Sequence, residues 1–179
     1  MKIMDWLEYI VFGFLRLMRG LPLNRILNKG ISTRVFADYF KNFEKLEAVR
    51  GIFGEKAGEI LRNLKVDFTW FGGYMFVDSS NGHLVVNVRY LNSGDKVDIY
   101  LDLIHELCHV KQFMEGKELF DARYNYVERP TEIEAYRYTV QEAKRIGLGD
   151  ERICEYLKTE WMSDKDLSFL AKAVSIKCH

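Results

Sequence analysis

Three observations predict that this chain folds as a single α+β domain. Apolar residues make up 48% of its 179 residues and aromatic residues 14%, which is enough for a sizeable core. Apolar positions recur at helical spacing over most of the chain, whereas residues 65–91 are rich in the two-residue period of strands. No repeat, low-complexity tract or linker interrupts it. We expect one domain over residues 1–179, with a helical N-terminal part (1–64), a sheet with central helices (65–146) and C-terminal helices (147–179).

The first predicted element is an amphipathic helix over residues 3–18. Its uninterrupted apolar run, Tyr9–Leu15, is far shorter than the ~20 residues that a membrane-spanning helix needs. The basic start and small-residue cleavage site of a signal peptide are lacking. We expect this helix to pack against the rest of the domain. The alternative is peripheral docking onto a membrane surface or a partner protein.

Two helices are predicted between this element and the sheet. The first begins after Ser32 or Thr33 as N-cap and runs to about Arg50. Its apolar face consists of Phe36, Tyr39, Phe40, Phe43, Leu46 and Val49. The second is shorter and covers roughly residues 55–64.

Three short strands follow, and turn residues separate them. The predicted strands are Val66–Trp70, Tyr74–Asp78 and His83–Leu91. Gly72-Gly73 and the sequence Ser-Ser-Asn-Gly at residues 79–82 supply the turns. A small three-stranded antiparallel sheet is the simplest arrangement.

Four helices complete the predicted fold, at Lys96–Glu115, Pro130–Ile146, Glu151–Trp161 and Asp164–Ile176. Proline suits the first turn of a helix, and the glycines that follow the first two of these helices suit their ends. Ser163 and Asp166 resemble a capping box at the start of the last helix.

Charge and cysteine content narrow the classes of function. The 26 basic and 26 acidic residues balance, so nothing indicates a nucleic-acid-binding surface. Cys108, Cys154 and Cys178 are an odd number of cysteines at spacings that make no zinc ribbon. They argue against a disulfide framework and for a reducing, cytoplasmic setting. We expect Cys108 to lie in the core rather than to bind a metal.

The chemically most informative motif is His105-Glu106-Leu107-Cys108-His109, an H-E-x-x-H pattern within a predicted helix. Two histidines four residues apart lie on one face, so both imidazoles can bind one metal ion. Glu106 lies beside that ion, where a general base is needed to deprotonate a bound water. Of the other two histidines, we expect His83 to be a strand residue rather than a ligand, and His179, the terminal residue, to be disordered.

A third ligand has to come from elsewhere, because catalytic zinc sites usually have three protein ligands and a water. The helix predicted from Pro130 carries two candidates, Glu132 and Glu134. They point about 200° apart around a helix, so both cannot face the same metal ion. The residues alone leave the choice open.

The two blocks together resemble the gluzincin branch of zinc metallopeptidases. In that branch the third ligand is a glutamate three residues before a small residue, and Glu132 with Ala135 matches this E-x-x-A pattern. The sequence is also similar to small archaeal and bacterial metallopeptidase-like proteins with H-E-L-x-H-V-x-Q followed by P-x-E-x-E-A-Y. Residues 105–112 and 130–136 match those patterns. The resemblance covers residues 65–146 in layout and favours Glu132.

The resemblance implies a zincin-like fold and hydrolysis of peptide bonds. One Zn2+ per chain, held by His105, His109 and Glu132, would lower the pKa of a bound water to about 7. Glu106 would take the proton, attack on a peptide carbonyl would follow, and Glu106 would return the proton to the leaving amine. In this fold class an edge strand pairs with extended peptide or protein substrate, and we expect His83–Leu91 in that place. Iron(II) also suits the ligand set, but H-E-x-x-H on one helix favours zinc.

Supporting roles are predicted for three further residues. Asp102 and Gln112 lie one turn from the histidines, and each could orient a ligand imidazole. Asp102 could equally cap a helix or pair with a lysine. Among the tyrosines Tyr124, Tyr126, Tyr136 and Tyr138, we choose Tyr126 as the residue that stabilises the oxyanion.

Two other functions remain alternatives to an active peptidase. One is a protease that is silent until a partner activates it. The other is a metal-stabilised, non-proteolytic interaction module that docks through the N-terminal helix. Glu106 argues against the module, because a structural metal site needs no base and is usually closed by four protein ligands.

Overall fold

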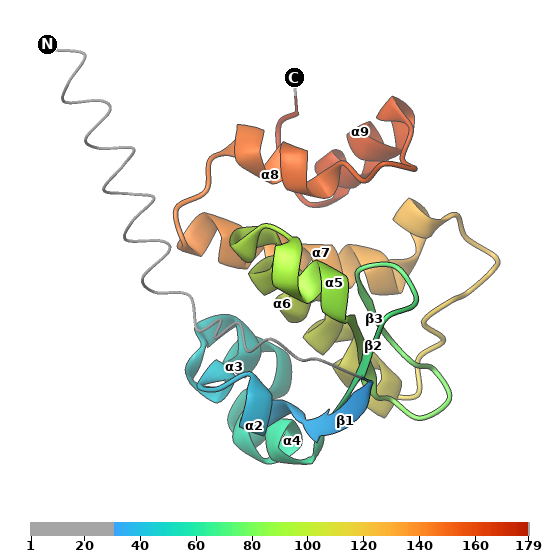
Figure 1. The fold of residues 1–179 in the computed structure, drawn as a ribbon. Helices are drawn as coiled ribbons and strands as arrows, with labels where there is room; N and C mark the ends of the chain where they lie inside the picture. The colour runs from blue at the N-terminus through green and yellow to red at the C-terminus, as the bar shows by residue number, and fades with distance from the viewer. Residues whose placement is uncertain (1–30, 179) are drawn as a thin grey trace, which may run out of the picture.

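The computed structural model describes residues 31–178. The helix expected over residues 3–18, and His179, lie outside the described residues. The fold is α+β with a four-stranded mixed sheet. In Figure 1, helices α8 (Asp150–Leu157) and α9 (Asp164–Ala173) lie on one side of α6 (Lys96–Met114) and α7 (Pro130–Arg145). The N-terminal helices lie on the opposite side, next to β1 (Ser32–Val35).

The sheet differs from the predicted three antiparallel strands in both number and direction. Its other strands are β2 (Lys65–Thr69), β3 (Met75–Val77) and β4 (Leu84–Asn87), and the strand order is β1-β2-β4-β3. β2 and β4 are parallel, whereas β1 pairs with β2, and β3 with β4, antiparallel. β4 separates β2 from β3, which leaves β3 at an edge of the sheet.

The long helix predicted up to Arg50 is wrong, because the chain breaks into shorter elements. Ser32–Val35 pairs with β2 instead of capping a helix. Asn42 then adopts a left-handed conformation (φ 69°) that no helix interior accepts. The resulting pieces are α2 (Phe36–Tyr39), the 3-10 helix η1 (Phe43–Lys45) and α3 (Glu47–Phe53). The aromatic residues predicted as the apolar face of the single long helix are nevertheless buried, as is Val49. The helix expected at residues 55–64 is present as the 3-10 turn η2 (Gly54–Lys56) followed by α4 (Ala57–Asn63).

The strand predicted from His83 to Leu91 is only half as long as expected. It ends at Asn87, whose Oδ1 accepts hydrogen bonds from the backbone N–H groups of Arg89 and Tyr90. This N-cap starts helix α5 (Val88–Ser93). Since β4 lies between β2 and β3, it is not the edge strand, and β3 takes that place.

The helices that carry the candidate motifs form as predicted. Asp95 caps α6 by accepting from the backbone N–H groups of Val97 and Asp98. Pro130 occupies the first turn of α7, after the 3-10 helix η3 (Tyr126–Glu128). The capping box of Ser163 and Asp166 at α9 is confirmed, although α8 and α9 are shorter than predicted. Among residues 31–178, no helix has the length and apolarity needed to cross a membrane.

The expectation that the cysteines form no disulfide is wrong. Cys154 on α8 and Cys178 near the C-terminus are bonded, and their Cα atoms are 5.6 Å apart. Their 24-residue separation follows no motif, so the sequence carries no sign that α9 folds back and brings them together. Cys108 is free and buried in the core, as predicted. The cytoplasmic setting stays a prediction, without support from cysteine content.

We predict that the double variant Cys154→Ser/Cys178→Ser unfolds more easily than the native chain. Closing a loop of this length restricts the unfolded chain and contributes about 3 kcal/mol to stability. Urea denaturation of the variant and of the native chain, each with and without a thiol reductant, measures the difference. Reductant should lower the midpoint of the native chain only. Equal midpoints for all four samples would show that the bond adds no stability.

Candidate metal centre

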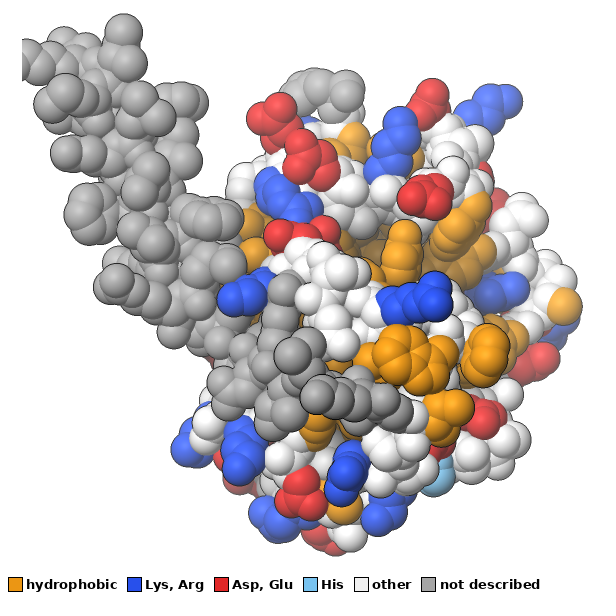
Figure 2. Space-filling view, in the orientation of Figure 1, with side chains coloured by type: hydrophobic (Ala, Val, Ile, Leu, Met, Phe, Trp, Pro, Cys, Tyr) orange, Lys and Arg blue, Asp and Glu red, His pale blue; other side chains and the backbone are white. Residues whose placement is uncertain are grey.

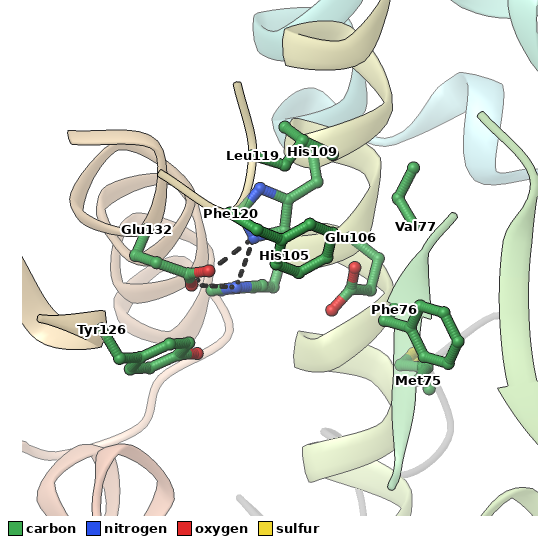
Figure 3. Close-up of a pocket in the computed structure, with 10 residues that line it drawn as sticks. All are labelled: Met75, Phe76, Val77, His105, Glu106, His109, Leu119, Phe120, Tyr126 and Glu132. Carbon is green, nitrogen blue, oxygen red and sulfur yellow. Dashed lines mark hydrogen bonds and ion pairs between the residues drawn. The ribbon is translucent and has the colours of Figure 1, made fainter. Parts of the chain in front are cut away.

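His105, His109 and Glu132 come together between α6 and α7. The Nε2 atoms of the two histidines are 3.0 Å apart, and Glu132 Oε2 lies 3.2 Å from His105 Nε2 and 3.5 Å from His109 Nε2. All three side chains are buried, with 4–6% of each residue exposed. Figure 3 shows both imidazoles of α6 facing the carboxylate of α7. This buried cluster could hold a metal ion.

The donor triangle fits an ion of the size found in protein metal sites. Ligand atoms bonded to a tetrahedral zinc ion at about 2.0–2.1 Å lie about 3.3 Å from one another. The three measured separations bracket that value. In their neutral forms the two imidazoles, together with the carboxylate, offer the lone pairs that first-row divalent ions prefer. The three side chains therefore form a cluster suited to a divalent transition metal.

Glu134, the other candidate from the sequence, points away from the cluster. Its carboxylate accepts hydrogen bonds from Lys111 Nζ and Lys117 Nζ, each at 2.9 Å, and from Gln112 Nε2 at 3.0 Å. The two glutamates thus diverge around α7 as the helical geometry requires, with Glu132 on the side of the histidines. The arrangement places Glu132 where the prediction needed a third ligand.

Burial and the neighbouring groups shift the pKa values of all three side chains in the cluster. Burial alone raises the pKa of Glu132, but hydrogen bonds and charge from His105 and His109 outweigh it and hold the pKa well below its usual range. Burial lowers the pKa of His105. Burial also opposes protonation of His109, but the nearby carboxylates of Glu132 and Glu106 raise its pKa above the ordinary value. Glu132 is therefore anionic and can bind a cation.

Gln112 orients the His109 imidazole, as predicted. Its Nε2 donates to the carbonyl of Thr131 at 2.9 Å and to Glu134, which fixes the orientation of the amide. Its Oε1 is then the acceptor for Nδ1–H of His109, at 2.7 Å. With the hydrogen on Nδ1, the lone pair of the neutral ring lies on Nε2 and faces the cluster.

The far side of the His105 ring, unlike that of His109, is held by packing rather than by a hydrogen bond. Its ring lies edge-on to that of Tyr136, with centroids 4.4 Å apart, and its buried Nδ1 has no hydrogen-bond partner among the described residues. The Tyr136 hydroxyl is 3.0 Å from that of Tyr126. Tyr126, the predicted oxyanion residue, therefore lines the site next to the cluster.

Glu106 lies outside the triangle and faces β3. Figure 3 shows its carboxylate between the imidazoles and Met75 and Phe76. Burial raises the pKa of Glu106 to about 8, while a hydrogen bond from the backbone N–H of Val77 acts in the opposite direction. A divalent cation at the cluster would favour the charged form as well. Glu106 is thus a buried carboxyl poised to exchange a proton close to neutral pH.

A cavity of about 120 Å³ joins these groups. Its walls are β3 on one side and Leu119, Phe120 and Tyr126 of the segment between α6 and α7 on the other. No sequence signal points to Leu119 and Phe120, because they follow no period in an irregular segment. The place of β3 beside the motif was also missed, since it depends on the strand order.

The structure separates several other predicted residues from the cluster. Asp102 neither orients a histidine nor pairs with a lysine; it accepts from the hydroxyls of Tyr90 and Tyr156 at 2.5 and 2.8 Å. His83 contacts Asp67 on the sheet, with 2.8 Å between Nδ1 and Oδ2. Tyr124 is exposed, and Tyr138 donates to the carbonyl of Gly51. These residues take no part in the cluster.

No family model, curated protein or solved structure matches this chain.

We predict that Gln112→Leu lowers the affinity for Zn2+ about 10- to 100-fold, because His109 loses the acceptor that fixes its tautomer. Competition titration of the metal-free protein against a chromophoric chelator measures the affinity. Gln141→Leu is the matched control, since this exposed glutamine of α7 makes no contact with the cluster. Circular dichroism establishes that each variant is folded. Equal affinity of a folded Gln112→Leu variant and the native chain would contradict a positioning role.

Proposed function

We propose that this protein is a zinc-dependent metallopeptidase of zincin-like architecture that hydrolyses peptide bonds in a peptide or protein substrate. The observation that carries the proposal is the combination of the buried His105–His109–Glu132 triangle with a separate carboxyl, Glu106, facing the adjoining cavity. A site that served only to hold a metal would not need that fourth group. Two histidines from one helix, a glutamate from a second helix and an edge strand beside them support the zincin-like assignment.

Zinc bound to the triangle would supply a water of lowered pKa and a Lewis acid for the carbonyl. Glu106 takes the proton from the attacking water, because its carboxyl is buried next to the two imidazoles and is held by the Val77 N–H. It then returns the proton to the amine that leaves. The cavity limits access of bulk water, which strengthens these electrostatic interactions.

Tyr126 is suited to donate a hydrogen bond to the oxygen of the carbonyl under attack. Its ring packs edge-on against Trp161, with centroids 4.7 Å apart, and its hydroxyl reaches the Tyr136 hydroxyl. Burial raises the pKa of Tyr126 well above its usual range, so the phenol keeps its proton. It can therefore act as a donor at neutral pH.

The β3 strand is suited to bind the substrate in extended form. Asp78 N–H bonds to the His83 carbonyl and Asn87 N–H to the Tyr74 carbonyl, both across to the β4 side. In an antiparallel pair such bonds occur at alternate residues, so the backbone groups of Met75 point away from β4. Met75 lines the cavity, and an added peptide strand can pair with it there.

We predict that the native chain cleaves unfolded casein and that Glu106→Gln loses about 10²- to 10⁴-fold in kcat while it keeps its metal. Removing the base leaves the three ligands untouched, so activity should fall while the metal content stays unchanged. Glu118→Gln makes the same chemical change at an exposed position outside the site and should behave like the native chain.

The assay also discriminates between the proposed function and its alternatives. Native activity in Glu106→Gln would exclude the mechanism. A metal-loaded native chain that cleaves no casein would favour the silent protease or the non-proteolytic module. Activity restored to the metal-free protein by iron(II) and not by zinc would keep the reaction and change the metal, because the ligand set suits both ions.

A further inference from the structure

A larger cleft of about 740 Å³ adjoins the cavity at the metal centre. The two spaces are neighbours, because His105, Glu106, Met75 and Tyr126 line both of them. The cleft lies between the β2–β3 turn and α5 on one side and α8 with the α8–α9 loop on the other. Figure 2 shows a hollow with hydrophobic side chains in this part of the surface, below α8 and α9. The space is large enough for several residues of a bound peptide.

Aromatic rings form much of the cleft walls. The rings of Tyr74 and Tyr90 are 4.6 Å apart at one side, and Trp161 packs on Tyr126 at the other. Trp161 is 60% exposed and Tyr74 50%, although exposed aromatic rings are costly to leave in water. Faces of such rings attract alkyl chains and cations alike.

The floor between these rings carries an anionic group without a counter-ion. Asp102 accepts from two tyrosine hydroxyls, and none of the described lysines, arginines or histidines bonds to it. Asp98, by contrast, pairs with Arg152. Glu160 at the rim makes no ion pair within the described part of the chain, and Lys158, the one lysine or arginine among the described lining residues, pairs with Asp164. The cleft is therefore anionic where a ligand would enter.

A second polar group in the cleft is also unused. The buried Oγ1 of Thr159 has no hydrogen-bond partner among the described residues, and Thr159 lines the same space. A buried hydroxyl without a partner costs free energy that a bound donor can recover.

We propose that this cleft binds a cationic group of the substrate, namely the side chain of a lysine or arginine or the amino terminus of the peptide. The inference rests on the proposed peptidase function and names its substrate class. Asp102 precedes His105 by three residues, which is about 4.5 Å along the axis of α6. The cationic residue therefore lies next to the bond that is cleaved, with its alkyl chain against Tyr74 and Tyr90.

The test uses peptides with both ends blocked, in which four alanines flank a central residue X on each side and X is lysine, arginine, norleucine or glutamate. Mass spectrometry locates the cleaved bond and gives kcat/KM for each peptide. We expect the lysine and arginine peptides to be cleaved beside X at least about tenfold faster than the norleucine peptide, because norleucine lacks only the charge. A twin set with a free amino terminus shows whether a terminal ammonium takes the same place.

Variants link that preference to the cleft. Asp102→Asn should bring the ratio of lysine to norleucine cleavage towards one. Glu160→Gln, at an exposed position where folding is not at risk, should lower the ratio in the same direction by about two- to threefold. Asp38→Asn, an exposed aspartate on α2, is the matched control and should leave the ratio as in the native chain.

A binding measurement separates this inference from the proposed function. Calorimetry on metal-loaded Glu106→Gln compares the same lysine and norleucine peptides without turnover. Tighter binding of the lysine peptide, lost on adding Asp102→Asn, supports the cationic subsite even if the native chain cleaves nothing. Cleavage without any preference, together with equal binding of the two peptides, overturns the subsite and leaves the peptidase function standing.

Discussion

The packing of α7 against α6 is the interaction on which the rest of the site depends, because it buries the Glu132 carboxylate against two imidazoles. Burying a carboxylate away from solvent costs free energy unless opposite charge or hydrogen bonds compensate for the lost hydration. His105 and His109 supply that compensation, and the start of α7 at Pro130 places Glu132 in the first turn, where the helix dipole also favours an anion. Once these three groups are fixed, the position of a metal ion follows from them.

Because side chains point outward around a helix, residues of α6 reach α7, β3 and the cleft at the same time. The histidines face α7, Glu106 is one residue further round the helix and faces β3, and Asp102 opens to the cleft below α8. A ligand set, a proton acceptor and a subsite for substrate can thus share one rigid element. The Lys111, Lys117 and Gln112 contacts of Glu134 hold α7 in register with this helix, so the second glutamate supports the site without entering it.

The sequence was sufficient for the groups that lie on long helices and insufficient for the others. His105, Glu106, His109 and Gln112 share one helix, so their relative positions follow from its period, and the E-x-x-A resemblance selected Glu132. The mixed sheet was not predictable, because turn residues indicate hairpins between consecutive strands, whereas β2 pairs in parallel with β4 and not with β3. With β4 between β2 and β3, β3 lies at one edge of the sheet. The same limit applies to Asp102, whose tyrosine partners come from α5 and α8, and to the bond between Cys154 and Cys178.

The most direct test of the central claim is the metal content of the purified protein by elemental mass spectrometry, with Glu132→Gln and Glu134→Gln measured beside the native chain. The account predicts about one zinc per chain in the native protein and in Glu134→Gln, and a large loss in Glu132→Gln. The two variants make the same chemical change two residues apart on α7, so general effects of the substitution cancel. Zinc retained in Glu132→Gln and lost in Glu134→Gln, or no metal in the native chain even after zinc is supplied, would contradict the proposed centre.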